Sequence, residues 1–277
     1  MIYIVVMRSQ KEHTLDAKII EKLQALGVSA RVMEAANMIN TDEEIQAVQE
    51  YANNVSIVRL GYNDHGPVHM RTVLLNAITM LGFLRETGIK TSLETEGIGD
   101  FDDSLIAVLY GAMLHDMGMS MGRQDHEVFS IHLALPIIER HLSIVYKDNL
   151  QKKIMTRSLA LECVAGHMGN RPVYSLEAGI VQVADGCDMT KGRARISMSL
   201  SHNHKPGSIH QYSANSIEKV ILVKGQEKPI HIEVLMSSEV GIFQVEEVLL
   251  TKIASSTAKP YIELYAQVEG EELKQYL

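Results

Sequence analysis

The sequence predicts a mainly α-helical protein, a helical bundle with a smaller α+β module in the C-terminal segment. The N-terminal segment is a candidate to join that module. Apolar residues recur at helical spacing from Asn63 to about Arg195. Alternating, β-rich runs occur before residue 34 and after Ile196, where the polar stretch SLSHNHKPGSIHQYSAN marks a boundary. We therefore expect a small β-α-β segment at 1–36, a helical domain at 37–200 and an α+β module at 216–277.

The first 36 residues have the pattern of a strand, a helix and a second strand. Ile2–Met7 is a short apolar run typical of a buried strand, and Leu15–Leu26 has the apolar spacing of a helix that Gly27 would end. Val28–Met33 again resembles a strand. We expect these two strands to join the sheet of the C-terminal module.

The helical domain is expected to begin at a capping box. Thr41 and Glu44 are three residues apart, which predicts a helix starting there and running toward Leu60. The polar segments TSLETEGIGD and MGNRPVY are typical of loops between the later helices. Those later helices are predicted at Pro67–Glu86, Asp103–Asp116, His126–Val145, Leu150–His167 and Leu176–Met189.

The C-terminal segment combines strands with one helix. Glu218–Val223 and Pro229–Met236 flank a short link containing Gly225, which predicts a hairpin. Val240–Ala254 has helical spacing, and Tyr261–Val268 alternates as a strand does. Because this segment contains none of the candidate ligands described below, we expect a separate unit that serves assembly or substrate choice.

Composition narrows the range of functions. The chain has 277 residues, of which 46% are hydrophobic and 22% charged, and it contains no run approaching the roughly 18–20 apolar residues of a membrane span. Its two cysteines predict no disulfide framework and favour a reducing cytoplasm. A net charge of −8 disfavours general attraction to nucleic acid, so an anionic substrate would have to be held by local groups such as a metal ion.

Four predicted helices each direct a histidine or aspartate toward a common interior. His69 extends one apolar stripe, the pair His115-Asp116 ends a second, and His167 and Asp185 share apolar faces on two others. A single core histidine is usually just hydrogen-bonded. Several buried ionisable groups on separate helices are better explained by one shared partner, because each alone costs several kcal/mol. Imidazole and carboxylate together suit Mn, Fe, Ni, Zn or Mg.

These residues resemble the H…HD…D signature of the HD-domain metal-dependent phosphohydrolase superfamily. His69 lies in HGPVHMRTVLLNA, His115 and Asp116 in GAMLHDMGMS, and Asp185 in SLEAGIVQVADGCDM. The resemblance extends from about Asn63 to Arg195. It implies an HD-type bundle in which all four residues bind metal and Asp116 also takes part in catalysis.

Two more residues resemble ligands of the superfamily members that bind two metal ions. His126 is followed four residues later by a serine, as the second-metal histidine is followed by a small residue, whereas His132 is followed by a proline and fits less well. His167 resembles the first histidine of a His-His-Gly motif whose second position is methionine here. The resemblance therefore implies one or two divalent ions, with the full two-metal set in question.

His65 and a basic trio are candidates for handling the substrate. His65 stands four residues before His69, as in the H-N-x-x-H of cyclic-nucleotide phosphodiesterases, where the first histidine protonates the leaving oxygen. The alternative is a helix-capping or loop histidine. Lys191, Arg193 and Arg195 could neutralise substrate phosphates, although a solvated basic turn is the commoner explanation for such a trio.

The bundle followed by a hairpin, a helix and a strand is also similar to the C-terminal half of ribonuclease Y. The nucleic-acid-binding KH domain and the membrane anchor of that enzyme have no counterpart in this sequence. The similarity therefore supports the architecture more than an RNA substrate.

The resemblance implies a phosphohydrolase or phosphodiesterase that cleaves a nucleotide-like phosphate ester with a metal-activated water. The alternatives are an endoribonuclease acting on single-stranded RNA and a non-catalytic nucleotide-binding regulatory protein. As partners we expect a small phosphorylated or nucleotide-like substrate and a second copy of the chain in a homodimer, with no membrane. The predicted location is cytoplasmic.

Overall fold

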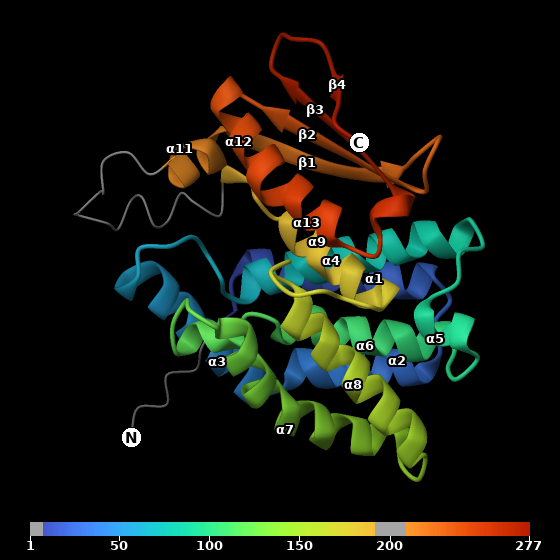
Figure 1. Ribbon diagram of the computed structural model, residues 1–277. Coiled ribbons are helices and arrows are strands. Elements are labelled where there is room, and N and C mark those ends of the chain that lie inside the picture. The colour runs from blue at the N-terminus through green and yellow to red at the C-terminus, as the bar shows by residue number, and fades with distance from the viewer. Residues whose placement is uncertain (1–7, 192–208) are drawn as a thin grey trace.

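A computed structural model describes residues 8–191 and 209–277 of the chain. It confirms the predicted fold class, since the chain is mainly α-helical with a small four-stranded sheet near its C-terminus. The helices form a bundle, and the sheet lies at one end of it (Figure 1). The predicted strand Ile2–Met7 and the residues Arg193 and Arg195 lie outside the described residues.

The bundle helices of the second half of the helical domain begin close to the predicted residues. Helix α4 starts at Pro67, whose missing N–H suits the first turn, and Ser175 caps α9 by accepting from the Ala178 amide at 3.1 Å. The bounds are α4 Pro67–Glu86, α6 Phe101–Leu114, α7 His126–Tyr146, α8 Leu150–Gly166 and α9 Leu176–Gly186.

The predicted strand at Val28–Met33 is wrong. Helix α1 (Gln10–Ala25) ends before Gly27, which adopts a φ of +62°, and the next helix, α2 (Ala30–Thr41), begins within the supposed strand. The apolar residues Val32, Ala35, Ala36 and Ile39 have helical spacing and are buried together. The prediction failed because six residues are too few to separate a period of 2 from a period of 3.6.

The start of the third helix is also displaced from the prediction. Thr41 ends α2, and Asp42 caps α3 (Glu43–Asn54), with its carboxylate accepting from the Glu44 amide at 2.8 Å. The chain continues through the π-helical segment Val55–Arg59. The segment predicted as the loop TSLETEGIGD contains a short helix, α5 (Ser92–Glu96), opened by its own capping box.

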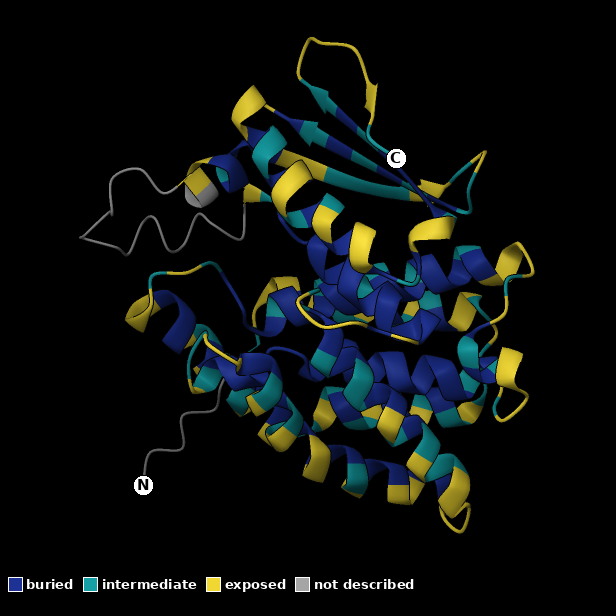
Figure 2. Cartoon of the chain, viewed as in Figure 1, coloured by how far each residue is buried: buried dark blue, intermediate teal, exposed yellow. Residues whose placement is uncertain are grey.

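Helix α6 is the centre of the bundle. It packs against α2, α4, α8 and α9, and nearly all of its residues are buried (Figure 2). Helix α4 and residues 126–145 of α7 have the length and apolar composition of a membrane span, with 67% and 39% of their apolar windows buried inside the protein. Core helices of helical bundles share this composition.

The C-terminal module is an α+β unit, as predicted. Strands β1 (Ile217–Lys224) and β2 (Ile230–Met236) form the expected antiparallel hairpin. A helical connection leads to β3 (Ile262–Val268), which pairs with β2 in parallel, and β4 (Lys274–Gln275) completes the order β1-β2-β3-β4. The helical pieces of the module are α11 Ile209–Ser216, α12 Ile242–Gln244, the π-helical segment Val245–Leu250 and α13 Thr251–Ser255.

The module shares one hydrophobic core with the bundle. The buried face of β2 and the apolar residues of the helical connection belong to the same cluster of buried side chains as α4, α6 and α9. Helix α9 packs against α13 of the module. Residue 179 of α9 is a glycine, which allows the segment just after α13 to approach the α9 backbone closely. A Cβ on Gly179 would lie 2.1 Å from Thr257 Oγ1 and 3.0 Å from the Ala258 amide nitrogen.

This close approach predicts that Gly179→Ala destabilises the protein. The added methyl group meets backbone that cannot move without undocking the module, so we expect a loss of about 1–3 kcal/mol in the free energy of unfolding. Urea denaturation measures it. Gly82→Ala in α4 is the control, because its Cβ would meet only the end of Leu26 at 3.3 Å. Equal effects of the two substitutions would contradict the proposed packing.

Candidate metal centre

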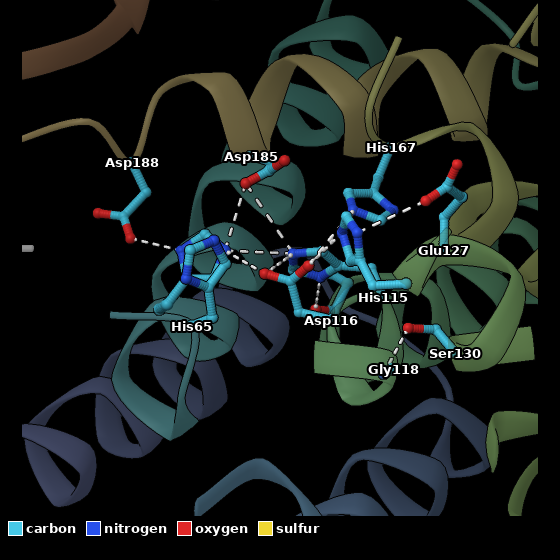
Figure 3. A network of polar contacts seen from close by, with 12 residues as sticks. His65, His115, Asp116, Gly118, Glu127, Ser130, His167, Asp185 and Asp188 are labelled. Carbon is cyan, nitrogen blue, oxygen red and sulfur yellow. Dashed lines mark hydrogen bonds and ion pairs between the residues drawn. The ribbon is translucent and has the colours of Figure 1, made fainter. Parts of the chain in front are cut away.

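Four imidazoles and two carboxylates converge in the interior of the bundle (Figure 3). All six side chains are buried. They come from different elements: α4, the end of α6, the start of α7, the end of α8 and the end of α9. They are the six metal ligands predicted from the sequence: His69, His115, Asp116, His126, His167 and Asp185.

One half of the cluster is formed around His69 and His115. Their Nε2 atoms lie 3.2 Å apart, and Asp116 Oδ2 lies 3.2 Å from the first and 3.3 Å from the second. Asp185 Oδ1 completes this group, 3.3 Å from His69 Nε2 and 3.9 Å from His115 Nε2. Two imidazole nitrogens and two carboxylate oxygens thus surround one point.

The other half is formed around His126 and His167. Their Nε2 atoms lie 3.1 Å apart, and Asp116 Oδ1 lies 3.1 Å from His126 Nε2 and 3.3 Å from His167 Nε2. Asp116 therefore directs one oxygen toward each pair of imidazoles. The two halves are joined through this single carboxylate.

The other ring nitrogen of every cluster histidine faces an oxygen. An Nδ1–H that donates to a carbonyl or carboxylate leaves Nε2 without a proton in the neutral ring. All four lone pairs then point into the cluster, as in metal sites whose histidines are oriented by hydrogen bonds. The acceptors are Asp188 Oδ2 for His69 at 2.7 Å, Ala112 O for His115 at 2.8 Å, Arg123 O for His126 at 2.8 Å and Val164 O for His167 at 2.7 Å.

Burial and neighbouring groups favour the ionised forms of Asp116 and Asp185 and the neutral form of His167. Burial raises the pKa of Asp116, but contacts with the imidazoles of His115, His126 and His167 lower it further, to well below its ordinary value. Burial likewise raises the pKa of Asp185, and Lys252 and His69 bring it well below normal. Burial lowers the pKa of His167 to about 4, against a smaller upward effect of Asp116. His167 is therefore neutral at physiological pH.

This arrangement fits a bound metal ion. Two imidazole nitrogens facing one another at 3.1–3.2 Å need a proton or a metal ion between them, because two facing lone pairs repel. Two sets of donor atoms are close enough to hold one, His69, His115 and Asp185 in one set and His115, Asp116 and His167 in the other. The buried histidines and aspartates could therefore hold a metal ion, as the sequence predicted.

A tight turn brings His126 to Asp116. The chain passes through the 3₁₀ turn Met117–Ser120, in which a Cβ on Gly118 would lie 2.0 Å from the His126 carbonyl oxygen. Ser130 Oγ accepts from the Gly118 amide at 2.8 Å, which explains the small residue four positions after His126. The rival candidate His132 is exposed and contacts the Val128 carbonyl, away from the cluster that His126 joins.

His65 lies beside the cluster, just before α4. Its ring centroid is 5.9 Å from that of His69, and it is 9% exposed, compared with 1% for His69. Its Nδ1 lies 2.6 Å from the Asn63 carbonyl and 2.9 Å from Ser56 Oγ. Nδ1–H therefore donates to the carbonyl, which fixes the orientation of the ring.

Of the predicted phosphate-binding trio, only Lys191 lies within the described residues, and it is not brought to the cluster. Lys191 is exposed, and its ammonium pairs with Glu218 at the start of β1 rather than with a cluster residue. Arg193 and Arg195 lie outside the described residues.

The sequence analysis missed three residues that contact the cluster. Asp188 follows Asp185 by three residues, one helical turn, so the spacing could have revealed it. Glu127 is buried beside His126, with its carboxylate 3.5 Å from His126 Nδ1 and accepting from Asn170 at 3.0 Å. Lys252 reaches the cluster from α13, and no local pattern connects it with a ligand 67 residues away.

Comparison with known proteins places the chain in a family. It is 43% identical over 230 residues to the uncharacterized protein MJ1020 of Methanocaldococcus jannaschii, an alignment that covers 83% of this chain and 86% of that protein. The chain belongs to the family of this archaeal protein. No family model matches the chain, and no solved structure matches it.

The lowered pKa of His167 predicts that the metal-free protein loses stability in acid. Because this pKa is about 4 in the folded state and 6.5 ordinarily, the unfolded chain binds more protons between these values. The free energy of unfolding should therefore fall as the pH is lowered through that range, by about 1 kcal/mol between pH 7 and 5.5. Urea denaturation in the presence of a chelator measures it. His167→Gln should show a fall smaller by that amount, and an identical pH dependence in both proteins would contradict the assignment.

Proposed function

We propose that this protein is a metal-dependent phosphohydrolase of the HD type that cleaves a nucleotide-like phosphate ester. The observation that carries the proposal is the position of Asp116, one oxygen of which faces the His69–His115 pair and the other the His126–His167 pair. A carboxylate shared by two groups of unprotonated imidazoles is suited to bridging two divalent ions.

We propose a centre for two ions with unequal protein ligation. The half containing His69, His115, Asp116 and Asp185 offers four donor residues, whereas the half containing His126, His167 and Asp116 offers three. Met168 stands where the superfamily has a further histidine. Three protein donors are typical of a catalytic ion that keeps a position for water or substrate. The nitrogen and oxygen donors suit Mn, Fe, Ni, Zn or Mg.

We assign a separate role in the proposed reaction to each group of residues. A divalent ion, when bound, supplies a Lewis acid and lowers the pKa of water toward neutrality. Asp116 and Asp185 provide the negative charge that retains cations in the buried centre, while Asp188 fixes the orientation of the His69 ring. His65, at the edge of the cluster with Nδ1–H engaged, donates the proton that the departing alkoxide needs.

The net charge of the chain disfavours a long polyanionic substrate. The net charge of −8 gives no general attraction for a polyanion, so the phosphate is held chiefly by the ions. We propose that the protein works in the cytoplasm as a homodimer. Cleavage of single-stranded RNA would reassign the protein to the endoribonucleases. Nucleotide binding without turnover would instead indicate a regulatory protein.

Asp116→Asn tests the metal-dependent reaction. Loss of the shared charge should remove most of the bound metal and abolish hydrolysis, because both halves of the centre lose a ligand. Metal content by mass spectrometry and turnover of a panel of nucleotides, cyclic nucleotides and short RNAs measure the two effects. The matched control is Asp148→Asn on an exposed turn, which should change neither. Full activity of Asp116→Asn would exclude this centre as the site of catalysis.

His65→Ala tests the acid. The variant should keep its metal but lose about 10²–10⁴-fold in turnover of esters with poor leaving groups, which need the proton. Nitrophenyl esters need little protonation, so their turnover should fall much less. His132→Ala, which removes an exposed histidine, is the control. Equal losses on both classes of ester would exclude His65 as the acid, and loss of bound metal would make it a ligand.

A further inference from the structure

We propose that Lys252 is a positioning residue of the metal centre, through which the C-terminal module and metal binding depend on one another. This inference rests on the metal centre of the proposed function. Lys252 is 8% exposed and lies in α13, within the module that the sequence predicted to be separate from the site. Its ammonium enters the bundle and contacts two cluster residues.

The two contacts connect opposite halves of the centre. Lys252 Nζ pairs with Asp185 Oδ2, while Asp185 Oδ1 faces His69 and His115. The same Nζ donates to the His167 carbonyl oxygen at 3.0 Å. One ammonium group thus fixes which Asp185 oxygen faces the imidazoles and holds the backbone that carries His167.

The position of Lys252 is itself fixed by α9. Gln182 Nε2 donates to the Lys252 carbonyl at 3.0 Å and to Ser255 Oγ at 2.6 Å. Gly186, next to Asp185, allows the approach, because a Cβ there would lie 3.2 Å from Lys252 Cδ. The ammonium therefore reaches Asp185 only while α13 is docked on α9.

Packing alone does not explain a lysine at this position. Burying an ammonium group costs free energy that an apolar side chain of similar length would not, so the charge is expected to have a use. Without it, Asp185 Oδ2 would lose the ammonium contact that holds the carboxylate in this orientation, and the carboxylate would turn toward other donors. That rotation would remove Oδ1 from the imidazole pair and with it one ligand of the first ion.

The contact of Lys252 with the cluster would couple metal binding to docking of α13, and such a coupling acts in both directions. If docking of α13 favours metal binding, then metal binding must favour docking of α13 by the same free energy. The module would consequently report the metal state of a centre that it does not ligate. This differs from a merely structural lysine, whose loss would lower stability with and without metal alike.

Lys252→Met tests the proposal against two comparison variants. Manganese affinity, measured by calorimetry, should fall about 10- to 100-fold, the usual effect of losing a group that orients a ligand. Electron paramagnetic resonance should show fewer magnetically coupled ion pairs. Lys252→Arg, which keeps a cation, should restore most of the affinity. Lys228→Met is the matched control, since Lys228 donates to the Ile262 carbonyl within the same module, away from the cluster.

A second measurement on the unaltered protein covers the case in which Lys252→Met does not fold. Adding manganese should slow hydrogen exchange of the amides in α13, and not of those in the exposed strand β4. Unchanged exchange in α13, or equal manganese affinity in Lys252→Met and the unaltered protein, would overturn the proposal. If the unaltered protein binds none of the candidate ions, Mn, Fe, Ni, Zn or Mg, the metal centre itself fails, and the proposed function fails with it.

Discussion

The shared carboxylate of Asp116 is the interaction on which the rest of the site depends. Its two oxygens each face a pair of imidazole ring nitrogens, in the buried interior of the bundle. Such a group of polar atoms is costly to bury without a cation, and it tolerates little displacement of any member. The bundle supplies this constraint by placing Asp116 just after α6, a helix in which nearly all residues are buried.

The positions of the other ligands follow from this constraint. The turn after Asp116 is closed by Gly118, so α7 begins with His126 directly against the carboxylate. His167 and Asp185 end α8 and α9, both of which pack on α6. A ligand at the end of a helix has a rigid base and lies beside backbone carbonyls of the last turn, which lack partners within the helix. The Nδ1 atoms of His115 and His167 contact such carbonyls, those of Ala112 and Val164.

Much of the site could be predicted because its residues continue apolar stripes. His69 and Asp185 occupy positions at which helical spacing demands a core-facing side chain, and the bundle helices were bounded to within a few residues for the same reason. The strand predicted at Val28–Met33 failed because its six residues fit two periods. Lys252 could not be foreseen. Its partner lies 67 residues earlier, and tertiary packing alone brings them together.

The hydrogen bond between His69 and Asp188 spans 119 residues of the chain and has a consequence for biosynthesis. A ribosome adding about 5–20 residues per second would produce Asp188 roughly 6–24 seconds after His69. Throughout that interval His69 lacks the carboxylate toward which its Nδ1 points in the finished fold. Lys252 follows later still, so the centre reaches its complete form only near the end of translation. If this protein binds metal as proposed, the complete metal centre is therefore available only on a nearly finished polypeptide.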